Sequence, residues 1–550
     1  MKPDKCDKPL AWLHQALLRL AVYYDALRRD PSLFACCLWW WITGKRLRAR
    51  LRLAPLLGRT PHSYSLWLSG EPILESFGEK GAECTSILAL ISRGAGEEKT
   101  LESAVREGFC ATLIPAGDSF SLPESTENRW FLPLMSGDVV RQGAGVRYRA
   151  AAAEASEDGC IIYADDDLLD KNGKRFSPHL KPDWNRELFR HLDYLTGSAI
   201  IRLGGLKVRG LLGDNWAAEL TKQAVQQSET MGSEPVHLRS ILHHRRTRPA
   251  PKTTPLPIYA GNMEKRLPAI SIIIPTRNRL DLLRPCLEGV ARTEYPGRIE
   301  IIVIDNGSDD RATLNYFEEL DPDFARILRD DGPFNFSALN NRAASEASGD
   351  ILCFLNNDIE VIDRAWLTIM AAQCQRKEIG AVGARLLYPN GLIQHAGVVI
   401  GIGGAAAHAH RLLDRDDVGY FHRHSLPQFV SAVTAACMVV RRERFFAVGG
   451  FDAARFAVSF NDVDLCLRLG ERGWRTLYEP RATLVHHESV SRGLDRDPIG
   501  AARQSAEVKA LQDRWGTALD NAHRGGEMRA RDPFHHPQLS PLSEQFVLRL

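Results

Sequence analysis

The sequence lacks the features of zinc-ribbon, disulfide-rich and nucleic-acid-binding proteins. Its 11 cysteines are an odd number and none are spaced as a Cys-x-x-Cys pair, which disfavours a zinc ribbon, a thioredoxin-type site and a disulfide framework. Its 70 Lys and Arg nearly balance its 68 Asp and Glu, so no global positive field indicates a nucleic-acid partner. We therefore expect a cytoplasmic protein with reduced thiols that binds no nucleic acid.

A long hydrophobic run is also missing. The most apolar stretch, residues 33–43, is about half as long as the ~20 residues that a membrane-spanning helix needs. It holds three consecutive tryptophans, and alternating basic and apolar residues follow at 45–52. This pattern fits a helix in the headgroup layer of an anionic inner membrane, and it fits equally a helical hairpin whose tryptophans pack on the protein. Peripheral membrane contact stays open.

Length and composition predict several folded domains. At 550 residues, with 44% hydrophobic and 25% charged residues, the chain is too long for one core and has a globular composition. Changes in pattern divide it into five parts. They are a helical segment at 1–75, a mixed α/β unit at 80–250, a proline-bearing linker at 251–267, a regular α/β unit at 268–495, and a C-terminal helix and tail at 496–550.

The unit that begins at residue 268 alternates short apolar strands with helices. Strands are expected at 269–274, 299–304 and 351–355, with helices at 279–291 and 338–347. This alternation predicts a parallel sheet with helices on both faces. In such sheets ligands gather beyond the carboxyl ends of the strands.

Polar and acidic residues follow these strands. The segments are Thr276-Arg-Asn278, Asp305-Asn-Gly-Ser308, Asn356-Asn-Asp358, Asn461-Asp-Val-Asp464 and His486-His487. Neither Gly-x-Gly-x-x-Gly nor GxxxxGK[ST] follows the first strand, which disfavours a dinucleotide-binding site and a P-loop. A single carboxylate after a strand, with a distant histidine, fits a hard divalent cation that shares its coordination with substrate phosphates.

Seven motifs in this unit stand in the order found in family 2 glycosyltransferases. They are ISIIIPTRNR, VIDNGSDD, NFSALNNRAA, GDILCFLNND, AVGGFD, NDVDLCLR and HHESVSRG. Residues 269–495 therefore resemble this family of nucleotide-sugar-dependent inverting enzymes. The resemblance implies the GT-A fold, a mixed α/β sheet flanked by helices. It also implies a nucleotide-sugar donor, a glycan acceptor, and Mg²⁺ or Mn²⁺ as cofactor.

The resemblance also implies a role for individual residues. By this resemblance the residues that bind the donor are Pro275, Thr276, Arg277, Asp305, Asn341, Asn356 and Asn357. Asp358 and His486 bind the cation, and Asp462 takes the proton of the acceptor. The residues on the acceptor side are Asp464, His395 and His487. Helix capping and turn formation are the alternative for Asp305 and Asp358, and solvent exposure is the alternative for Asp462 and Asp464. His395 fits core packing equally well.

Residues 80–250 resemble the same fold less closely. The stretches 161–167 and 236–243 look like its later strands, and 111–118 looks like the strand whose acidic end carries the metal. Only about 25 residues separate the first strand, at 86–91, from the strand at 111, too few for the usual nucleobase-binding elements. We expect a truncated, inactive GT-A-like domain that supports the second unit or presents the acceptor. A second working transferase is the alternative.

Together these patterns predict an inverting, metal-dependent glycosyltransferase of surface-polysaccharide assembly, such as O-antigen. By resemblance its donor is dTDP-rhamnose and its glycan acceptor is lipid-linked. A non-catalytic glycan-binding or scaffold protein with decayed domains is the alternative, favoured by Asn356 and Asn461, which stand where the family often has acids. Retention of Asp358 and Asp462 favours the enzyme. A nucleotidyltransferase is disfavoured because no glycine-rich basic loop follows the first strand.

Overall fold

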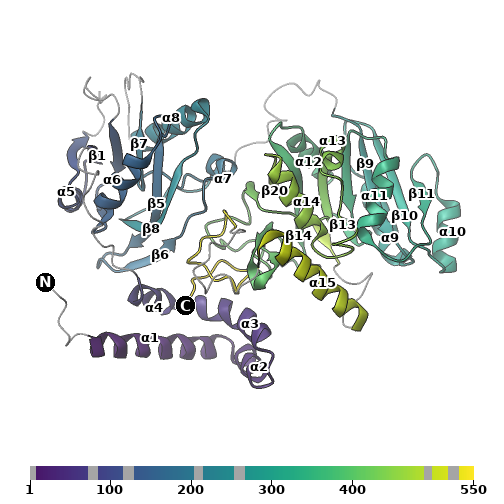
Figure 1. The fold of residues 1–550 in the computed structure, drawn as a ribbon, viewed down its shortest axis with the longest axis horizontal. Helices are drawn as coiled ribbons and strands as arrows, with labels where there is room; N and C mark the ends of the chain where they lie inside the picture. The colour runs from purple at the N-terminus through teal and green to yellow at the C-terminus, as the bar shows by residue number, and fades with distance from the viewer. Residues whose placement is uncertain are drawn as a thin grey trace.

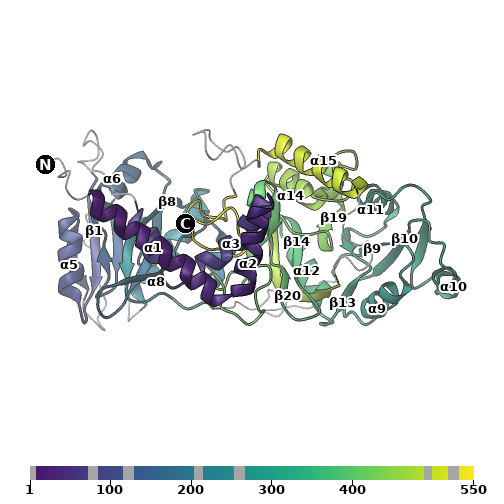
Figure 2. The same ribbon diagram turned by 90° about the horizontal axis from the view of Figure 1, so that it is seen from below.

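Two α/β units lie side by side above a layer of N-terminal helices (Figure 1). The computed structural model describes residues 8–71, 85–114, 129–203, 215–252, 267–487, 498–517 and 532–550. The predicted linker at 251–267 falls almost wholly outside these ranges. The N-terminal helices are α1 (Lys8–Arg29), α2 (Pro31–Ile42), α3 (Arg46–Gly58) and α4 (Ser63–Ser69). Seen from below, α1 crosses under the first unit (Figure 2).

The first unit is one mixed sheet with helices packed on it. Its elements are β1 (Ile87–Ser92), α5 (Glu97–Arg106), β2 (Cys110–Ile114), β3 (Trp130–Leu134), β4 (Val139–Val140), α6 (Ala144–Glu154), β5 (Ile161–Leu169), β6 (Arg175–His179), α7 (Arg186–His191), β7 (Ala199–Arg202), α8 (Trp216–Met231) and β8 (Val236–Arg245). The strand order is β2-β1-β3-β7-β5-β8-β4, and β6 pairs with β5.

The second unit has a larger mixed sheet. Its elements are β9 (Ile270–Thr276), α9 (Leu280–Ala291), β10 (Ile299–Asp305), α10 (Arg311–Glu319), β11 (Arg326–Arg329), α11 (Phe336–Glu346), β12 (Ile351–Leu355), β13 (Ile359–Val361), α12 (Trp366–Cys374), β14 (Ile379–Leu387), β15 (Ile393–His395), β16 (Val398–Ile400), the 3₁₀ turn η2 (Ile402–Gly404), β17 (Ala406–His408), β18 (Gln428–Val430), β19 (Cys437–Arg441), α13 (Arg442–Ala447), α14 (Asn461–Glu471) and β20 (Arg475–His486). Helix α15 (Pro498–Trp515) follows.

The strand directions in this sheet agree with a mixed sheet and correct the purely parallel one that the alternation alone predicts. The order is β11-β10-β9-β12-β19-β14-β20-β13, and β9 to β12 pair in parallel. Strand β19 runs antiparallel to both of its neighbours. A long connection precedes β19, and the hydrophobic periodicity of a strand does not reveal the direction in which it runs.

The first sheet repeats the second, strand for strand. In order, β2, β1, β3, β7, β5, β8 and β4 take the places of β10, β9, β12, β19, β14, β20 and β13, with the same parallel or antiparallel pairing at each step. Strand β11 and helices α10 and α11 have no counterpart among the described residues of the first unit.

This correspondence corrects one assignment made from the sequence. The stretch 111–118 was expected to match the metal-bearing strand, but β2 lies at the place of β10, and residues 115–118 are outside the described ranges. The strand at the place of β12 is β3, which leads to Asp138 directly before β4, as Asp358 directly precedes β13. In the sequence, the stretches that contain β2 and β3 are both short apolar runs followed by an aspartate, Asp118 and Asp138. This pattern alone could not show which of the two is the metal-bearing strand.

Local sequence explains where the key helices begin. The side chain of Asp310 accepts a hydrogen bond from the Thr313 N–H and caps α10, and Asn335 caps α11 in the same way through the Ala338 N–H. Strands β9 and β12 are buried along their whole length, so their apolar runs fill the core on both faces of the sheet.

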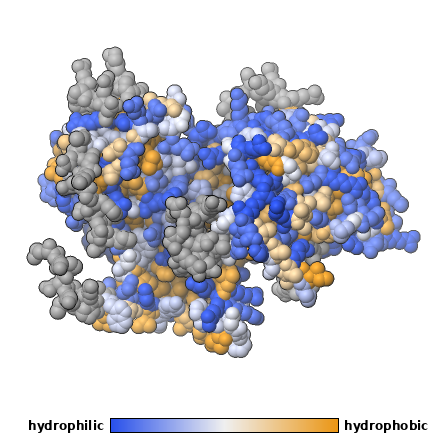
Figure 3. Space-filling view, viewed as in Figure 1, coloured by the Kyte–Doolittle hydropathy of each residue, from blue (hydrophilic) through white to orange (hydrophobic). Residues whose placement is uncertain are grey.

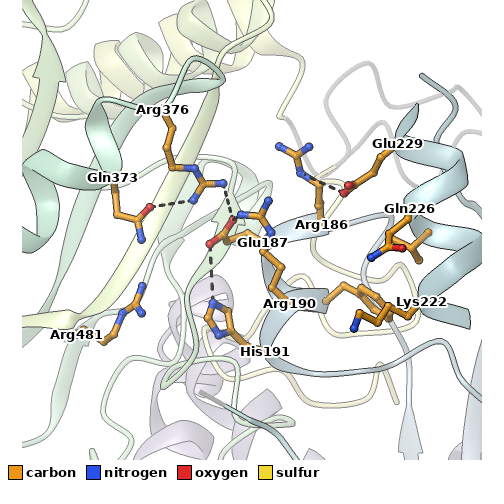
Figure 4. A pocket seen from close by; sticks show the side chains of 12 residues that line it. Arg186, Glu187, Arg190, His191, Lys222, Gln226, Glu229, Gln373, Arg376 and Arg481 are labelled. Carbon is orange, nitrogen blue, oxygen red and sulfur yellow. Dashed lines mark hydrogen bonds and ion pairs between the residues drawn. The ribbon is translucent and has the colours of Figure 1, made fainter. Parts of the chain in front are cut away.

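The two units share a polar interface that surrounds a cavity of about 510 Å³ (Figure 4). Glu187 of α7 pairs with Arg376 of the second unit at 2.7 Å. The buried Asn185 accepts from the Phe429 N–H and donates to the Phe429 carbonyl at 2.8 Å. The tail, residues 532–550, lies between the units, where the Asp183 N–H donates to the Pro533 carbonyl. The interface therefore depends on specific hydrogen bonds from all three parts.

Replacing Asn185 with alanine is expected to destabilise the protein by about 1–3 kcal/mol for each buried backbone group left without a partner. The Phe429 N–H and carbonyl lose their bonds, and α7 loses its cap at the Leu188 N–H. Chemical denaturation measures the free energy of unfolding. Asn172→Ala, at an exposed turn between β5 and β6, is the control. Equal stability of the two variants would contradict the interface described above.

Candidate functional site

A cavity of about 790 Å³ opens at the carboxyl ends of β9 and β12. It lies in the place where ligands bind on open α/β sheets. Its lining residues are Pro275, Thr276, Arg277, Asn278, Arg279, Asn306, Phe334, Phe336, Leu339, Asn356, Asn357, Asp358, Val398, Ala406, Ala407, His408, Thr434, Ala435, Ala436, Val458, Ser459, Phe460, Asn461, Asp462, Val463, His486 and Gln504. Asp358 and Asp462 are the two carboxylates among these described residues.

Asp358 and His486 meet on one wall of the cavity. Antiparallel pairing of β13 with β20 places Ile359 opposite His486, and this register brings the Asp358 Oδ1 atom to 3.0 Å from His486 Nε2. Burial favours a raised pKa for Asp358, but the hydrogen bond and charge of His486 outweigh it and lower the pKa below its ordinary value. The carboxylate is therefore ionised at neutral pH.

Gln394 fixes the tautomer of His486. The Gln394 Oε1 atom accepts from His486 Nδ1 at 2.7 Å, while its amide nitrogen is directed at the His486 carbonyl. A proton on Nδ1 leaves the Nε2 lone pair directed at the Asp358 carboxylate, so two acceptors face each other unless a second proton or a cation lies between them. One carboxylate and one imidazole oriented by an amide fit Mn²⁺ or Mg²⁺.

The two asparagines that precede Asp358 both face the cavity. The Asn356 amide nitrogen lies 3.3 Å from His486 Nε2, and Asn357 donates to the Thr276 hydroxyl at 2.9 Å. These contacts connect the ends of β9, β12 and β20. Pro275, at the end of β9, and Arg277, just beyond it, line the same cavity. The predicted donor residues at these two strand ends are thus brought together.

Asp462 faces the cavity from the first turn of α14. Its Oδ2 atom accepts from the Ala435 N–H at 3.1 Å, and Oδ1 accepts from the Val463 N–H at 2.8 Å. Burial raises the pKa of Asp462 above its ordinary value, although these N–H groups oppose the shift. Phe460 enters the helix with a φ of 61°, a strained conformation for a phenylalanine beside a reactive carboxylate. A basic carboxylate is thus held at a fixed place.

A histidine pair forms another wall. His408, on β17, lines the cavity, and its Nδ1 atom is 2.7 Å from Nδ1 of the buried His395. The Thr434 N–H donates to His395 Nε2, so His395 carries its proton on Nδ1 and donates it to His408. Burial, followed by the neighbouring His408, lowers the pKa of His395 well below its ordinary value. His395 therefore orients His408 and does not itself line the cavity.

Four other predicted site residues do not line the cavity. Asp305 accepts from the Ser308 N–H and pairs with Arg329 at 2.5 Å, and its neighbour Asn306 takes the lining position. Both amide atoms of Asn341 bond the backbone of Phe451.

The remaining two lie elsewhere as well. Asp464 is buried and pairs with Arg468, while its other oxygen accepts from Trp515 of α15. His487 turns away to Glu360 at 3.2 Å. Between the two adjacent histidines, the alternation of side chains along β20 directs His486 inward and His487 outward.

Several residues that line the cavity or hold its lining side chains in place were not identified from the sequence. Gln394 gave no signal because it lies far from His486 in the chain. Phe334, which is 40% exposed at the cavity, and Gln504 of α15 come from segments without a motif. Thr434 follows an apolar run and looks like part of a strand. His408, on β17, stands in an Ala-His-Ala-His sequence and was not among the predicted site residues either.

Comparison with known proteins identifies the unit that holds this cavity. The family model described as Glycosyl transferase family 2 matches residues 271–401. These residues belong to glycosyltransferase family 2. The predicted family is confirmed, and the mixed sheet around the cavity has the GT-A fold that the resemblance implied.

The chain matches only part of each of three curated relatives. The chain is 38% identical over 435 residues to the uncharacterized protein y4gI of Sinorhizobium fredii, covering 72% of this chain and 47% of that protein. It is 36% identical over 386 residues to the O-antigen biosynthesis protein RfbC of Myxococcus xanthus, covering 64% and 30%. An N-acetylglucosaminyl-diphospho-decaprenol L-rhamnosyltransferase of Mycobacterium tuberculosis is 40% identical over 100 residues, covering 18% and 32%. The chain thus spans less than half the length of each.

Substituting Gln394 by methionine is expected to weaken Mn²⁺ binding about 10-fold or more in the presence of a nucleoside diphosphate, because His486 loses its orienting partner. Electron paramagnetic resonance of free Mn²⁺ during a titration measures the affinity. Gln375→Met, at an exposed position after α12, is the matched control. An unchanged affinity in Gln394→Met would show that His486 does not bind the cation.

Proposed function

We propose that the chain is an inverting, divalent-metal-dependent glycosyltransferase that moves a sugar from a nucleoside-diphosphate donor to a hydroxyl of a growing surface glycan. One observation carries this proposal: Asp358, between β12 and β13, and Asp462, in the first turn of α14, face a single cavity together with His486. The family of residues 271–401 supports the same reaction.

Asp462 is suited to take the proton of the acceptor hydroxyl. That hydroxyl has a very high pKa, so its proton has to leave as the new glycosidic bond forms. The raised pKa of Asp462 makes the carboxylate a stronger base than an exposed aspartate. Because the other lining carboxylate, Asp358, lies at the histidine, the described cavity offers one base and no separate nucleophile, which supports single displacement with inversion.

The wall formed by Asp358 and His486 is suited to the donor. Asp358 and His486 would hold the cation, and a bound divalent cation would neutralise charge on the departing nucleoside diphosphate. Asn356 and Asn357 present amides at the same wall, and Arg277 adds a positive charge to the lining. Phe334 offers an exposed ring at the cavity against which a base or sugar can stack.

The relatives support a donor and an acceptor class. One is named for O-antigen biosynthesis and another for transfer of L-rhamnose to a diphospho-decaprenol-linked sugar. We therefore propose dTDP-rhamnose as the donor and a lipid-linked glycan as the acceptor, with the protein on the cytoplasmic face of the membrane. The nine cysteines in the described ranges are all free thiols, which agrees with a reducing compartment.

We infer that the first unit is an inactive repeat. Val139 pairs with His244 as Ile359 pairs with His486, so Asp138 and His244 stand where the cation would be held. Burial raises the pKa of Asp138 to about 6, and His244 bonds Asp167 instead at 2.7 Å. Internal contacts thus occupy the position of the second unit's metal site, which supports a role as a scaffold.

A panel of nucleotide sugars tests the transferase. We expect release of a nucleoside diphosphate from one donor in the presence of Mn²⁺ or Mg²⁺, and none with a chelator. Asp462→Asn is expected to lose about 10²–10⁴-fold in turnover while its donor affinity, measured by calorimetry, stays unchanged. Asp416→Asn, whose side chain is 87% exposed, is the control. If no donor binds with either metal, the non-catalytic glycan-binding or scaffold alternative replaces the enzyme.

The pH dependence of turnover follows from Asp462. A general base acts in its deprotonated form, so a raised pKa moves the acidic limb of kcat/KM above pH 3.8, the ordinary aspartate value. Activity is complete above this raised pKa and falls as the pH decreases through it. Rates measured from pH 4 to pH 8 with saturating Mn²⁺ test this, after stability over the range is checked by circular dichroism. A rate independent of pH above pH 4 would contradict the role of Asp462.

A further inference from the structure

Helix α1 carries a broad apolar face that the rest of the described chain leaves exposed. Its large apolar residues are between 43% and 70% exposed, and they are Trp12, Leu13, Leu17, Leu20, Tyr23, Tyr24 and Leu27. Most of them recur at intervals of three and four residues, which places them on one side of the helix. Val22 and Ala26, on the other side, are buried against the protein. An amphipathic helix that directs its apolar face outward needs a partner.

Helices α2 and α3 extend this face and add positive charge. Leu38, Trp39, Trp41 and Ile42 are between 47% and 70% exposed. Residues 31–70 hold six Lys and Arg and no Asp or Glu. The guanidinium of Arg48 lies 4.6 Å from the ring of Trp40. Trp39 and Trp41, on either side of Trp40, stay exposed to solvent in the described structure. Their exposure argues against the alternative of a helical hairpin whose tryptophans pack on the protein.

The apolar side chains gather on one edge of the molecule. Figure 3 shows hydrophobic residues over the layer of α1 to α3, and Figure 2 shows that the three helices lie at the face seen from below. In the described ranges none of the helices has the length and hydropathy to cross a bilayer. Tryptophan with apolar residues on one side and a rim of arginine fits the interface of an anionic membrane, where apolar side chains enter the acyl boundary and cations meet lipid phosphates.

This layer packs against the wall of the cavity that carries His408. A Cβ atom built on Gly403, in the turn between β16 and β17, would lie 3.6 Å from Leu51 of α3. Tyr64 and Trp67 of α4 pack in one cluster with Val399 and Ile402 of the same hairpin. Contacts through α3 and α4 therefore join the apolar layer to the β16–β17 hairpin, which lines the cavity.

We propose that the exposed face of α1 and α2, with the basic residues of α3, is a docking surface for an anionic lipid membrane. The face lies in the plane of the membrane–water interface. The β16–β17 wall of the cavity packs on the other side of the helical layer, through α3 and α4. This surface does not depend on the proposed reaction. The part that this surface would play in catalysis rests on the proposed function, because an acceptor glycan linked to a membrane lipid would then reach the cavity along the β16–β17 wall.

Sedimentation with vesicles tests the surface. The purified chain is mixed, without nucleotide, with vesicles of phosphatidylcholine alone or of phosphatidylcholine with phosphatidylglycerol. We expect binding to the anionic vesicles. Leu20→Glu and Trp39→Glu are each expected to weaken it about ten-fold or more, and Arg46→Gln and Arg50→Gln about five-fold each on anionic vesicles. Val105→Glu, at a residue of α5 that is 56% exposed, is the control and should bind as the unchanged protein does.

Other occupants of the face would give different results. Failure to bind either vesicle would overturn the proposal. A dimer in analytical ultracentrifugation that Leu20→Glu dissociates, without vesicle binding, would assign the face to a second copy. Donor binding by Leu20→Glu is measured in parallel and is expected to stay unchanged. Loss of vesicle binding with donor binding kept supports the surface, whereas a chain that binds vesicles but no donor contradicts only the proposed reaction.

Discussion

Two acceptor atoms face each other on one wall of the cavity, and the rest of the site depends on this pair. His486 Nε2 is directed at the Asp358 carboxylate because Gln394 accepts the proton of Nδ1. Three strands are needed to build the arrangement: β13 sets the position of Asp358, β20 delivers His486, and β15 delivers Gln394. A buried carboxylate and an imidazole nitrogen 3.0 Å apart are costly in this orientation unless a proton or a cation lies between them.

The repeated topology allows the two units to be compared at equivalent positions. Both units have the same strand order and pairing directions, and a bulge interrupts β5 with β8 and β14 with β20 in the same place. In the first unit Asp166 pairs with Lys181 at 2.8 Å, and Asp167 pairs with Arg175 at 2.5 Å. In the second unit Asp358 faces a cavity instead. The same fold therefore supports an internal charge network in one case and an open site in the other.

The sequence predicted the second unit closely. Strand β12 has the expected bounds, and the strand ends that bring Thr276, Asn356 and Asp358 together follow from a buried apolar run before each polar segment. Periodicity did not predict the direction of β19. The resemblance also assigned to the donor site Asn341, whose amide holds the Phe451 backbone, since a motif does not tell binding from packing.

The N-terminal helices show a further limit. The sequence predicted helices over residues 1–75, but the amphipathic pattern of a helix does not say whether its apolar face meets a core or another surface. Only the fold shows Trp12 and Leu20 exposed while Val22 is buried. The charge pattern of residues 45–52 fitted both membrane contact and a packed hairpin. The exposure of Trp39 and Trp41 in the structure favours membrane contact. The proposed docking surface and the proposed transfer site thus lie on adjoining parts of one molecule.

The most direct measurement is anomalous diffraction from crystals grown with dTDP and Mn²⁺. The proposed site predicts one strong manganese peak between the Asp358 carboxylate and His486 Nε2, with the diphosphate beside it. Asp165, His237 and His536, whose ligand atoms lie within 4.8 Å of one another, are another group in the described chain with the geometry to hold a metal ion. A peak there and none at Asp358, or nucleotide bound outside the cavity, would contradict the assignment of the active site.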